Sequence, residues 1–163
     1  MSPPAARARR RGFLAAAALA VACSHGPTYE QLSRQQAGPR PGYARIFVYT
    51  PLRSEALGFH PEITLDGERV GTSSPGTFFY VDRQPGVYEL DIPSKRSAGA
   101  FGSAVASDPA RVSVWLGRAA FVQVDVVEFG NTVQTRLRTR EREEGEPLIR
   151  ACRYAAPLGA PRD

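Results

Sequence analysis

Few residues in this 163-residue sequence have the type and spacing that catalysis requires. The two histidines are His25, in a polar segment, and His60, which lies between Phe59 and a proline. A histidine-dependent hydrolase would have to pair His60 with a serine such as Ser97 or Ser103, or with a carboxylate, because a base must activate the nucleophile. No Gly-x-Ser-x-Gly sequence is present. We therefore expect His60 to be a turn residue, with a hydrolase that uses His60 as the alternative.

The acidic residues and cysteines show no recognised metal or acid–base pattern. A transition-metal site brings several His, Cys or carboxylate ligands together, and no HxH, CxxC or HExxH spacing occurs. Asp66 with Asp82, or Glu89 with Asp91, could act as paired carboxylates. A turn explains Asp66 better, however, and the solvent face of a strand explains Glu89 and Asp91. No glycine-rich phosphate loop is present either. The sequence thus predicts no catalytic residue, no cofactor and no metal.

Four arginines are spaced two residues apart, which places them on one face of a strand: Arg136, Arg138, Arg140 and Arg142. Such a face could bind anionic lipid or glycan. Three acidic residues lie within or directly after the same stretch: Glu141, Glu143 and Glu144. We therefore expect a solvated face whose charges are balanced, and we keep the binding of an anionic ligand as the alternative.

The net charge gives no support for a nucleic-acid partner. The whole chain carries a formal charge of +5. Four of its basic residues lie among residues 1–22, and the rest of the chain has 17 basic and 16 acidic side chains. A nearly neutral chain exerts little electrostatic steering, so we predict no nucleic-acid ligand.

Residues 1–22 have the pattern of an export signal. Four arginines precede an uncharged run of about 11 residues, which is too short for a membrane-spanning helix of roughly 20. The sequence Leu19-Ala20-Val21-Ala22-Cys23 resembles the lipobox of bacterial lipoproteins, although leucine is commoner at the position of Ala20. That resemblance implies a diacylglycerol on Cys23 and cleavage just before it. The alternative is an ordinary signal peptide cut near Ala22, giving a soluble secreted domain with a Cys23–Cys152 disulfide.

The residues around this segment bear on export and location. Residues 10–14, Arg-Arg-Gly-Phe-Leu, partly resemble the twin-arginine export motif, so both that route and the general secretory route stay open. Ser24 stands where an aspartate would resemble an inner-membrane retention signal. We therefore expect an outer-membrane lipoprotein that faces the periplasm, held by acyl chains such as palmitate.

Residues 24–42 are polar and rich in Pro, Gly and Gln, which predicts a flexible tether spanning roughly 22–26 Å on average. A short helical turn near Tyr29–Arg34 is the alternative for part of this segment. From Tyr43 onward, short runs of β-branched and aromatic residues alternate with turns, of which Asp66-Gly67 is the strongest hairpin signal. Valines at 122, 124 and 126 share one strand face. The spacing of turns predicts an all-β fold, an antiparallel β-sandwich of about seven strands. Residues 93–110 read as a long loop that could serve this protein's own function.

The C-terminal part predicts a short helix that opens at Pro147 and ends near Arg153. Leu148, Ile149 and Cys152 would form its packing face, with Cys152 as a small buried hydrophobe if Cys23 carries lipid. Trp115 is either a core residue or a sugar-stacking platform, and its place between Val114 and Leu116 favours the core.

Several short segments together resemble a known family. They are 44–49, the Asp-Gly hairpin with Val70-Gly71, residues 76–79, and the turn 84–86 leading into Val87-Tyr88. The arrangement is similar to the bacterial envelope lipoprotein family known as domain of unknown function 2846, and more loosely to PEGA-type surface domains. The resemblance implies a lipobox followed by a compact β domain, and it implies no catalytic or ligand residue.

The sequence therefore predicts four parts: a signal peptide over 1–22, a lipidated cysteine and tether over 23–42, a β domain over 43–154, and a loose tail over 155–163. We expect a membrane-anchored envelope lipoprotein that is not an enzyme and that binds or scaffolds an envelope protein or glycan.

Overall fold

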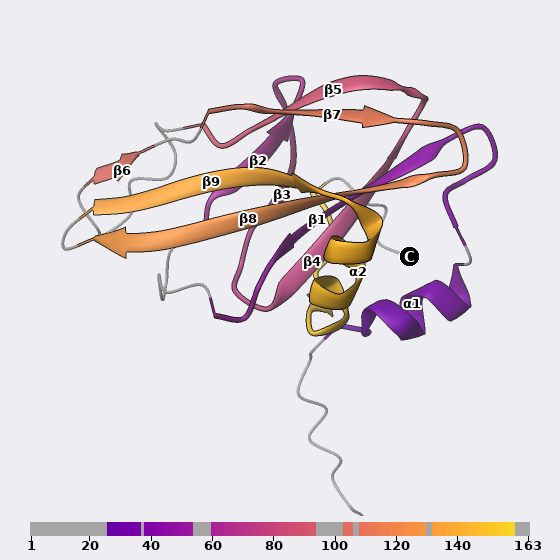
Figure 1. The fold of residues 1–163 in the computed structure, drawn as a ribbon, viewed down its shortest axis with the longest axis horizontal. Coiled ribbons are helices and arrows are strands. Elements are labelled where there is room, and N and C mark those ends of the chain that lie inside the picture. The colour runs from indigo at the N-terminus through magenta and orange to yellow at the C-terminus, as the bar shows by residue number, and fades with distance from the viewer. Residues whose placement is uncertain are drawn as a thin grey trace, which may run out of the picture.

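A computed structural model describes residues 26–36, 38–53, 60–93, 103–105, 108–129 and 132–158 (Figure 1). The predicted signal peptide, Cys23, His25 and most of the loop 93–110 lie outside these residues. The described chain is mostly β, with two sheets and two short helices.

The elements follow one another in this order: α1 (Tyr29–Gln35), β1 (Ala44–Thr50), β2 (Glu62–Leu65), β3 (Glu68–Thr72), β4 (Thr77–Arg83), β5 (Gly86–Asp91), β6 (Ser103–Val105), β7 (Ala110–Val114), β8 (Ala119–Phe129), β9 (Thr132–Arg140), α2 (Arg142–Arg150) and β10 (Arg153–Tyr154). The structure has more strands than the roughly seven predicted. Two of the strands, β6 and β10, have only three and two residues and leave little pattern in the sequence.

The first sheet has the strand order β10-β4-β1-β8-β9-β6 and is mixed. β1 pairs antiparallel with β4 but parallel with β8, and both end strands also pair in parallel. The second sheet, β3-β2-β5-β7, is antiparallel throughout. Parallel neighbours need a crossover connection, and here the chain between β1 and β8 contains all four strands of the second sheet as well as β4 and β6. The prediction of purely antiparallel pairing therefore differs from the structure in the first sheet.

The predicted hairpin at Asp66-Gly67 is confirmed. Asp66 has φ 48° and Gly67 has φ 80°, so both central residues lie in the left-handed region that a type I′ turn requires. The Asp66 carboxylate accepts a hydrogen bond from the Glu89 N–H at 2.8 Å, and the Asp66 N–H donates to the Glu89 carbonyl at 2.8 Å. Asp66 thus fixes the turn to β5, in agreement with its prediction as a turn residue.

Both sheets contribute to one buried cluster. Ile46 and Val48 of β1 and the three predicted valines of β8 (122, 124 and 126) meet side chains of the second sheet such as Ile63 and Leu90. Alternation along each strand sends these residues to the same side. Leu90 and Ile92 are buried and Tyr88 is partly buried, so Glu89 and Asp91 lie on the opposite face, as predicted.

The outer face of the first sheet is covered by the two helices. Every residue of β1 is buried, because Phe47 and Tyr49 point to this face while their neighbours point to the other core. Tyr29 and Leu32 of α1 pack here with Ile149 of α2 and other aromatic residues of the sheet. A strand buried on both faces reads as a continuous apolar run, which residues 46–49 at its centre show.

The segment predicted as a tether is partly folded. Thr28 caps α1 through the Gln31 N–H, and the Gln31 side chain accepts from the Thr28 N–H, which completes a capping box. A Cβ at Gly26 would lie 1.9 Å from the Tyr154 carbonyl oxygen, so the chain is already closely packed there. The buried Tyr29 meets Phe47 edge to face, with ring centroids 5.4 Å apart. The structure therefore differs from the tether prediction from Gly26 onward, and α1 lies where a short helical turn was the alternative.

The C-terminal part also differs from its prediction. α2 begins at Arg142, so Pro147 lies inside the helix and Glu141 to Glu144 form its start instead of a solvated turn. Ile149 and Cys152 are buried as predicted, whereas Leu148 is 41% exposed. The tail is hydrogen bonded at two points, from the Ala155 N–H to the Phe78 carbonyl and from the Leu158 N–H to the Val70 carbonyl.

The prediction of Trp115 as a core residue was wrong. Trp115 is 64% exposed, since it follows the last inward-facing residue of β7 and turns to the outer face of the second sheet. No helix of the described chain covers that face.

Candidate binding cleft

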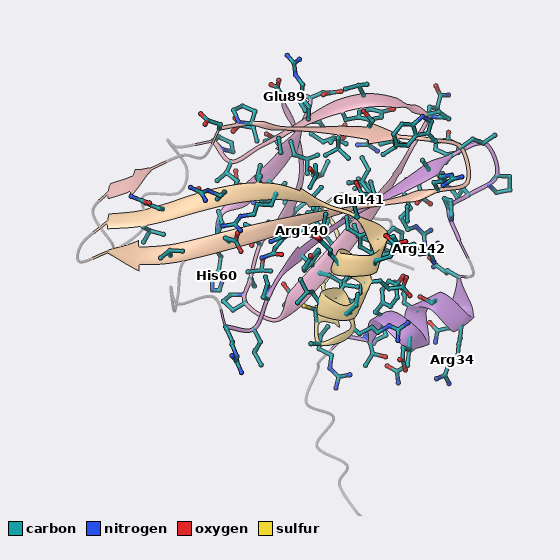
Figure 2. The ribbon with its side chains drawn as sticks, viewed as in Figure 1. Arg34, His60, Glu89, Arg140, Glu141 and Arg142 are labelled. Atoms are coloured by element: carbon teal, nitrogen blue, oxygen red, sulfur yellow. The ribbon has the colours of Figure 1, made fainter. Side chains whose placement is uncertain are left out.

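A cleft of about 550 Å³ lies between β7 and the region where β8 begins, β9 ends and α2 starts. Its lining includes Arg111 and Trp115 of the β7 side, Arg118 before β8, and Arg140 and Arg142 opposite. Figure 2 shows Arg140, Glu141 and Arg142 gathered around the start of α2, on the side that faces β7.

The β7 side of this cleft is an open strand edge. β7 is the last strand of the second sheet, so one of its edges has no strand partner within the described chain. The other terminal strands offer less, because β6 and β10 have three and two residues and β3 receives the hydrogen bond from Leu158. Natural sheets usually protect such edges, since the free N–H and C=O groups can pair with another chain.

A tight turn holds Trp115 and Arg118 at the cleft. Gly117 has φ 70°, and the Arg118 N–H donates to the Trp115 carbonyl at 3.0 Å. The turn is tied to the start of β1, because the Gly117 N–H donates to the Tyr43 carbonyl and the Arg45 N–H to the Arg118 carbonyl, both at 3.0 Å. The exposed indole is therefore presented on a backbone fixed at both ends.

The cleft contains two arginines with no acidic partner in the described part of the chain, Arg111 and Arg118, and both are exposed. Arg140 and Arg142 are already paired, with Glu144 at 3.3 Å and with Glu146 at 2.9 Å. Within the cleft, the unpaired positive charge thus lies on Arg111 of β7 and on Arg118 just before β8.

The predicted arginine face is largely neutralised. Arg138 Nε lies 2.8 Å from Asp125 Oδ2, an ion pair without the in-line geometry of a hydrogen bond. Arg140 Nε also donates to Gln123 Oε1 at 3.1 Å. Arg142 belongs to α2 and not to the strand. The predicted charge balance is confirmed for Arg140 with Glu144. Arg138 and Arg142 pair with Asp125 and Glu146 instead, and Arg136 is exposed with no ion pair among the described residues.

A polar network lies beneath α2 at the same place. The Tyr49 hydroxyl donates to Gln123 Oε1 at 3.3 Å, and Gln123 Nε2 donates to Asp125 Oδ1 at 2.5 Å. Burial raises the pKa of Tyr49 to about 12, even though the positive charge of Arg140 nearby lowers it. Tyr49 therefore stays protonated at neutral pH and acts here as a hydrogen-bond donor.

A second hollow, of about 520 Å³, lies between α1 and α2. Its main charges are satisfied within α2, because Glu146 accepts from Arg142 at 2.9 Å and from Arg150 at 3.0 Å. These two hydrogen bonds lower the pKa of Glu146. The hollow has fewer unpaired groups to offer a ligand than the cleft beside β7.

His60 is exposed and lies before β2, and its Nδ1 is 3.0 Å from Ser74 Oγ. Ser97 lies outside the described residues, and Ser103 belongs to β6. Ser74 is in the turn before β4, and no sequence pattern connects it with His60. Glu89 is exposed on β5, as predicted, and Asp91 uses one carboxylate oxygen to accept from the Ile92 N–H at 2.7 Å.

Asp82 has a structural partner that sequence reasoning missed. Arg45 Nε donates to Asp82 Oδ1 at 2.8 Å and Arg45 Nη2 donates to Oδ2 at 3.0 Å, with both side chains almost fully buried. The guanidinium also lies over the Tyr80 ring, 3.9 Å from its centroid. Alternation on β1 and β4 brings Arg45 opposite Asp82 in the register, a pairing that only the strand partnership reveals.

Cys152 carries a free, fully buried thiol, and burial raises its pKa to about 11. Its Sγ lies 3.5 Å from the Thr50 carbonyl oxygen. A protonated, enclosed thiol is a poor nucleophile, so its role here is packing. Across the described ranges, no group of three or more His, Cys, Asp and Glu residues could hold a metal ion, and no helix meets the length and hydropathy of a membrane span.

Comparison with known proteins adds no relative. No protein-family model matches the chain, and no curated protein matches it. The resemblance to domain of unknown function 2846 therefore stays a prediction that rests on the short sequence segments.

Proposed function

We propose that this chain is a lipid-anchored protein of the bacterial envelope, attached through Cys23 to the outer membrane and facing the periplasm. The support is the arginine-rich leader and the sequence Leu19-Ala20-Val21-Ala22-Cys23. The two-sheet architecture with a shared core fits the predicted β-sandwich and is compatible with a member of the 2846 family. Intact mass of the membrane-extracted protein tests the anchor. A chain that starts at Cys23 and carries the added mass of acyl groups is expected, and an unmodified Cys23 would overturn it.

The β domain is a non-enzymatic binding module, and the observation that carries this proposal is the open edge of β7 beside the exposed Trp115. A strand edge supplies main-chain donors and acceptors to an added strand. Trp115 offers a large apolar surface, and aromatic residues are enriched in the centre of interfaces.

The partner that fits best is an extended segment of another envelope protein with acidic side chains. Arg111 and Arg118 at the two ends of the β7 segment would meet those carboxylates, because arginine forms two parallel hydrogen bonds with a carboxylate. A glycan would use the indole but would leave the strand edge without partners.

A photo-crosslinking residue at Ser113, which is exposed on β7, tests this assignment in living cells. We expect a crosslink to one envelope protein, and we expect it to be lost in Arg111→Glu/Arg118→Glu. Glu68, exposed on β3 at the far edge of the same sheet, is the matched position that should give no crosslink. Crosslinks from both positions, to glycan only, or from neither position would refute the proposal.

A hydrolase that uses His60 is the second candidate, and the contact between His60 and Ser74 is what favours it. His60→Ala separates the two functions, since a binding module keeps its envelope phenotype and its Ser113 crosslink in that variant.

A further inference from the structure

The described chain begins at the end of the domain where α2 stops. Gly26 packs against Tyr154, the Tyr154 N–H donates to the Pro27 carbonyl at 2.9 Å, and Thr28 bridges to Arg153. Figure 1 shows this entry point at the lower edge of the view, beside the last turn of α2 and the start of α1.

Cys23 lies only three residues before Gly26. A fully extended chain spans at most about 3.3–3.6 Å per residue, so the two Cα atoms are no more than roughly 11 Å apart. We propose that this end of the domain lies directly against the lipid bilayer as a membrane-contacting surface. This inference rests on the proposed lipid attachment at Cys23, and it replaces the long flexible tether that residues 24–42 suggested.

Apolar side chains project from this end. Leu52, just after β1, is 71% exposed, and Leu148 on the last turn of α2 is 41% exposed. Leu52 lies over Gly76, whose carbonyl accepts from the Arg153 N–H at 2.8 Å, so these residues surround the point where the chain enters. Leucines in such positions are exposed to water in the isolated domain but can enter the boundary between headgroups and acyl chains.

Arginines on the same end provide the charge that a phospholipid surface attracts. Arg53 and Arg153 are both exposed, and neither has an acidic partner in the described ranges. Figure 2 places Arg34 of α1 on this lower side as well, where it forms an exposed ion pair with Glu30 at 3.9 Å. Arginine forms paired hydrogen bonds with phosphate groups. Exposed leucines with arginines around them are typical of a protein surface that lies on a bilayer and does not cross it.

The arrangement also assigns a direction to the candidate cleft. β7 runs along the upper edge of Figure 1, on the opposite side of the molecule from the last turn of α2. The candidate cleft, which opens between β7 and the start of α2, would therefore lie at a distance from the membrane, where a partner can reach it.

Quenching of tryptophan fluorescence by brominated phospholipid measures this orientation. Trp115 is the only tryptophan and lines the candidate cleft. The fluorescence of the wild-type protein therefore reports on the side of the domain that is proposed to lie away from the membrane. The test variant is Trp115→Phe with Leu148→Trp, and Trp115→Phe with Leu52→Trp is a second one. Each full-length protein is extracted from membranes and reconstituted in vesicles of phosphatidylethanolamine and phosphatidylglycerol.

We expect brominated acyl chains to lower the tryptophan emission of both double variants at least twofold and to leave that of the wild-type protein unchanged. Adding Arg53→Glu/Arg153→Glu to the Leu148→Trp variant should reduce its quenching. Intact mass is recorded on every sample. If the protein is lipid-modified but neither double variant is quenched, or if the wild-type protein is quenched equally, this inference is overturned and the anchor is left intact. An unmodified Cys23 overturns the proposed function and this inference with it.

Discussion

Replacing Asp82 by alanine should strongly destabilise the domain, because it removes the carboxylate that faces a buried guanidinium. Arg45 is 6% exposed and Asp82 is 8% exposed, and two hydrogen bonds of 2.8 and 3.0 Å join them. Once Asp82 is lost, the stacking of Arg45 over Tyr80 stays but both charge-assisted hydrogen bonds are gone.

The magnitude follows from this burial. Breaking a buried ion pair by removing one partner costs about 3–5 kcal/mol, since the other charge stays desolvated. The remaining contact with the Tyr80 ring offsets part of the cost, so we expect about 3 kcal/mol for Asp82→Ala. A domain has a free energy of unfolding of about 5–15 kcal/mol, so the variant should still fold.

Urea unfolding followed by far-UV circular dichroism measures this loss. Glu30→Ala is the control, because Glu30 forms an exposed pair with Arg34 at 3.9 Å and such pairs contribute about 0–1 kcal/mol. The double variant Arg45→Met/Asp82→Leu should recover most of the stability, since it removes the buried charge as well as its partner. The reasoning is refuted if Asp82→Ala costs no more than Glu30→Ala, or if the double variant is less stable than Asp82→Ala.

The remaining predictions concern close packing and titration. Gly145→Ala should destabilise the protein by about 1–3 kcal/mol through overpacking, because its new Cβ would lie 2.6 Å from the Phe121 Cβ. Gly38→Ala, with no atom within 4 Å of the new Cβ, should leave the urea midpoint unchanged, and equal effects of the two would contradict this. Burial raises the pKa of Cys152 from 9.0 to about 11, so stability should be fully present below pH 9 and decline as the pH rises toward 11. In Cys152→Ala the decline should begin nearer pH 10, where the buried tyrosines start to titrate in the unfolded chain. The same onset in both proteins would show that the thiol does not contribute.

Local signals in the sequence predicted the β strands and turns well, and the reason is physical. A type I′ hairpin needs positive φ at both central residues, and Asp-Gly is among the few pairs that adopt this conformation readily, so Asp66-Gly67 strongly favours this turn. The alternation in 86–92 and 122–126 likewise fixes which side chains face the core. The sequence does not reveal how the strands are ordered, so the parallel pairing of β1 with β8 and the ion pair between Arg45 and Asp82 were both missed.

The candidate cleft was missed for a related reason. Trp115 has the flanking residues of a core position, and its exposure depends on the outer face of the second sheet being uncovered in the described chain. The alternation of Arg111 and Ser113 with Val112 and Val114 was a signal that one face of this strand meets solvent. In the polar segment 26–36 the sequence indicated a short helical turn only as an alternative to a tether, and the capping box of Thr28 and Gln31 is the signal that favours the helix.

The contact between the first and last segments of the domain, at Thr28 and Arg153, has a consequence for the order of folding. Thr28 bridges Arg153, and β10 pairs with β4 only after all of the other strands have been made. β1 lies at the centre of the first sheet and cannot gain its second neighbour until β8 has emerged. Contacts of such long sequence separation form slowly, and a nascent chain that lacks β8 and β10 leaves the apolar faces of β1 and β4 uncovered. The N-terminal half of this domain therefore depends on β8 and β10, and its folding is completed only after both strands are available.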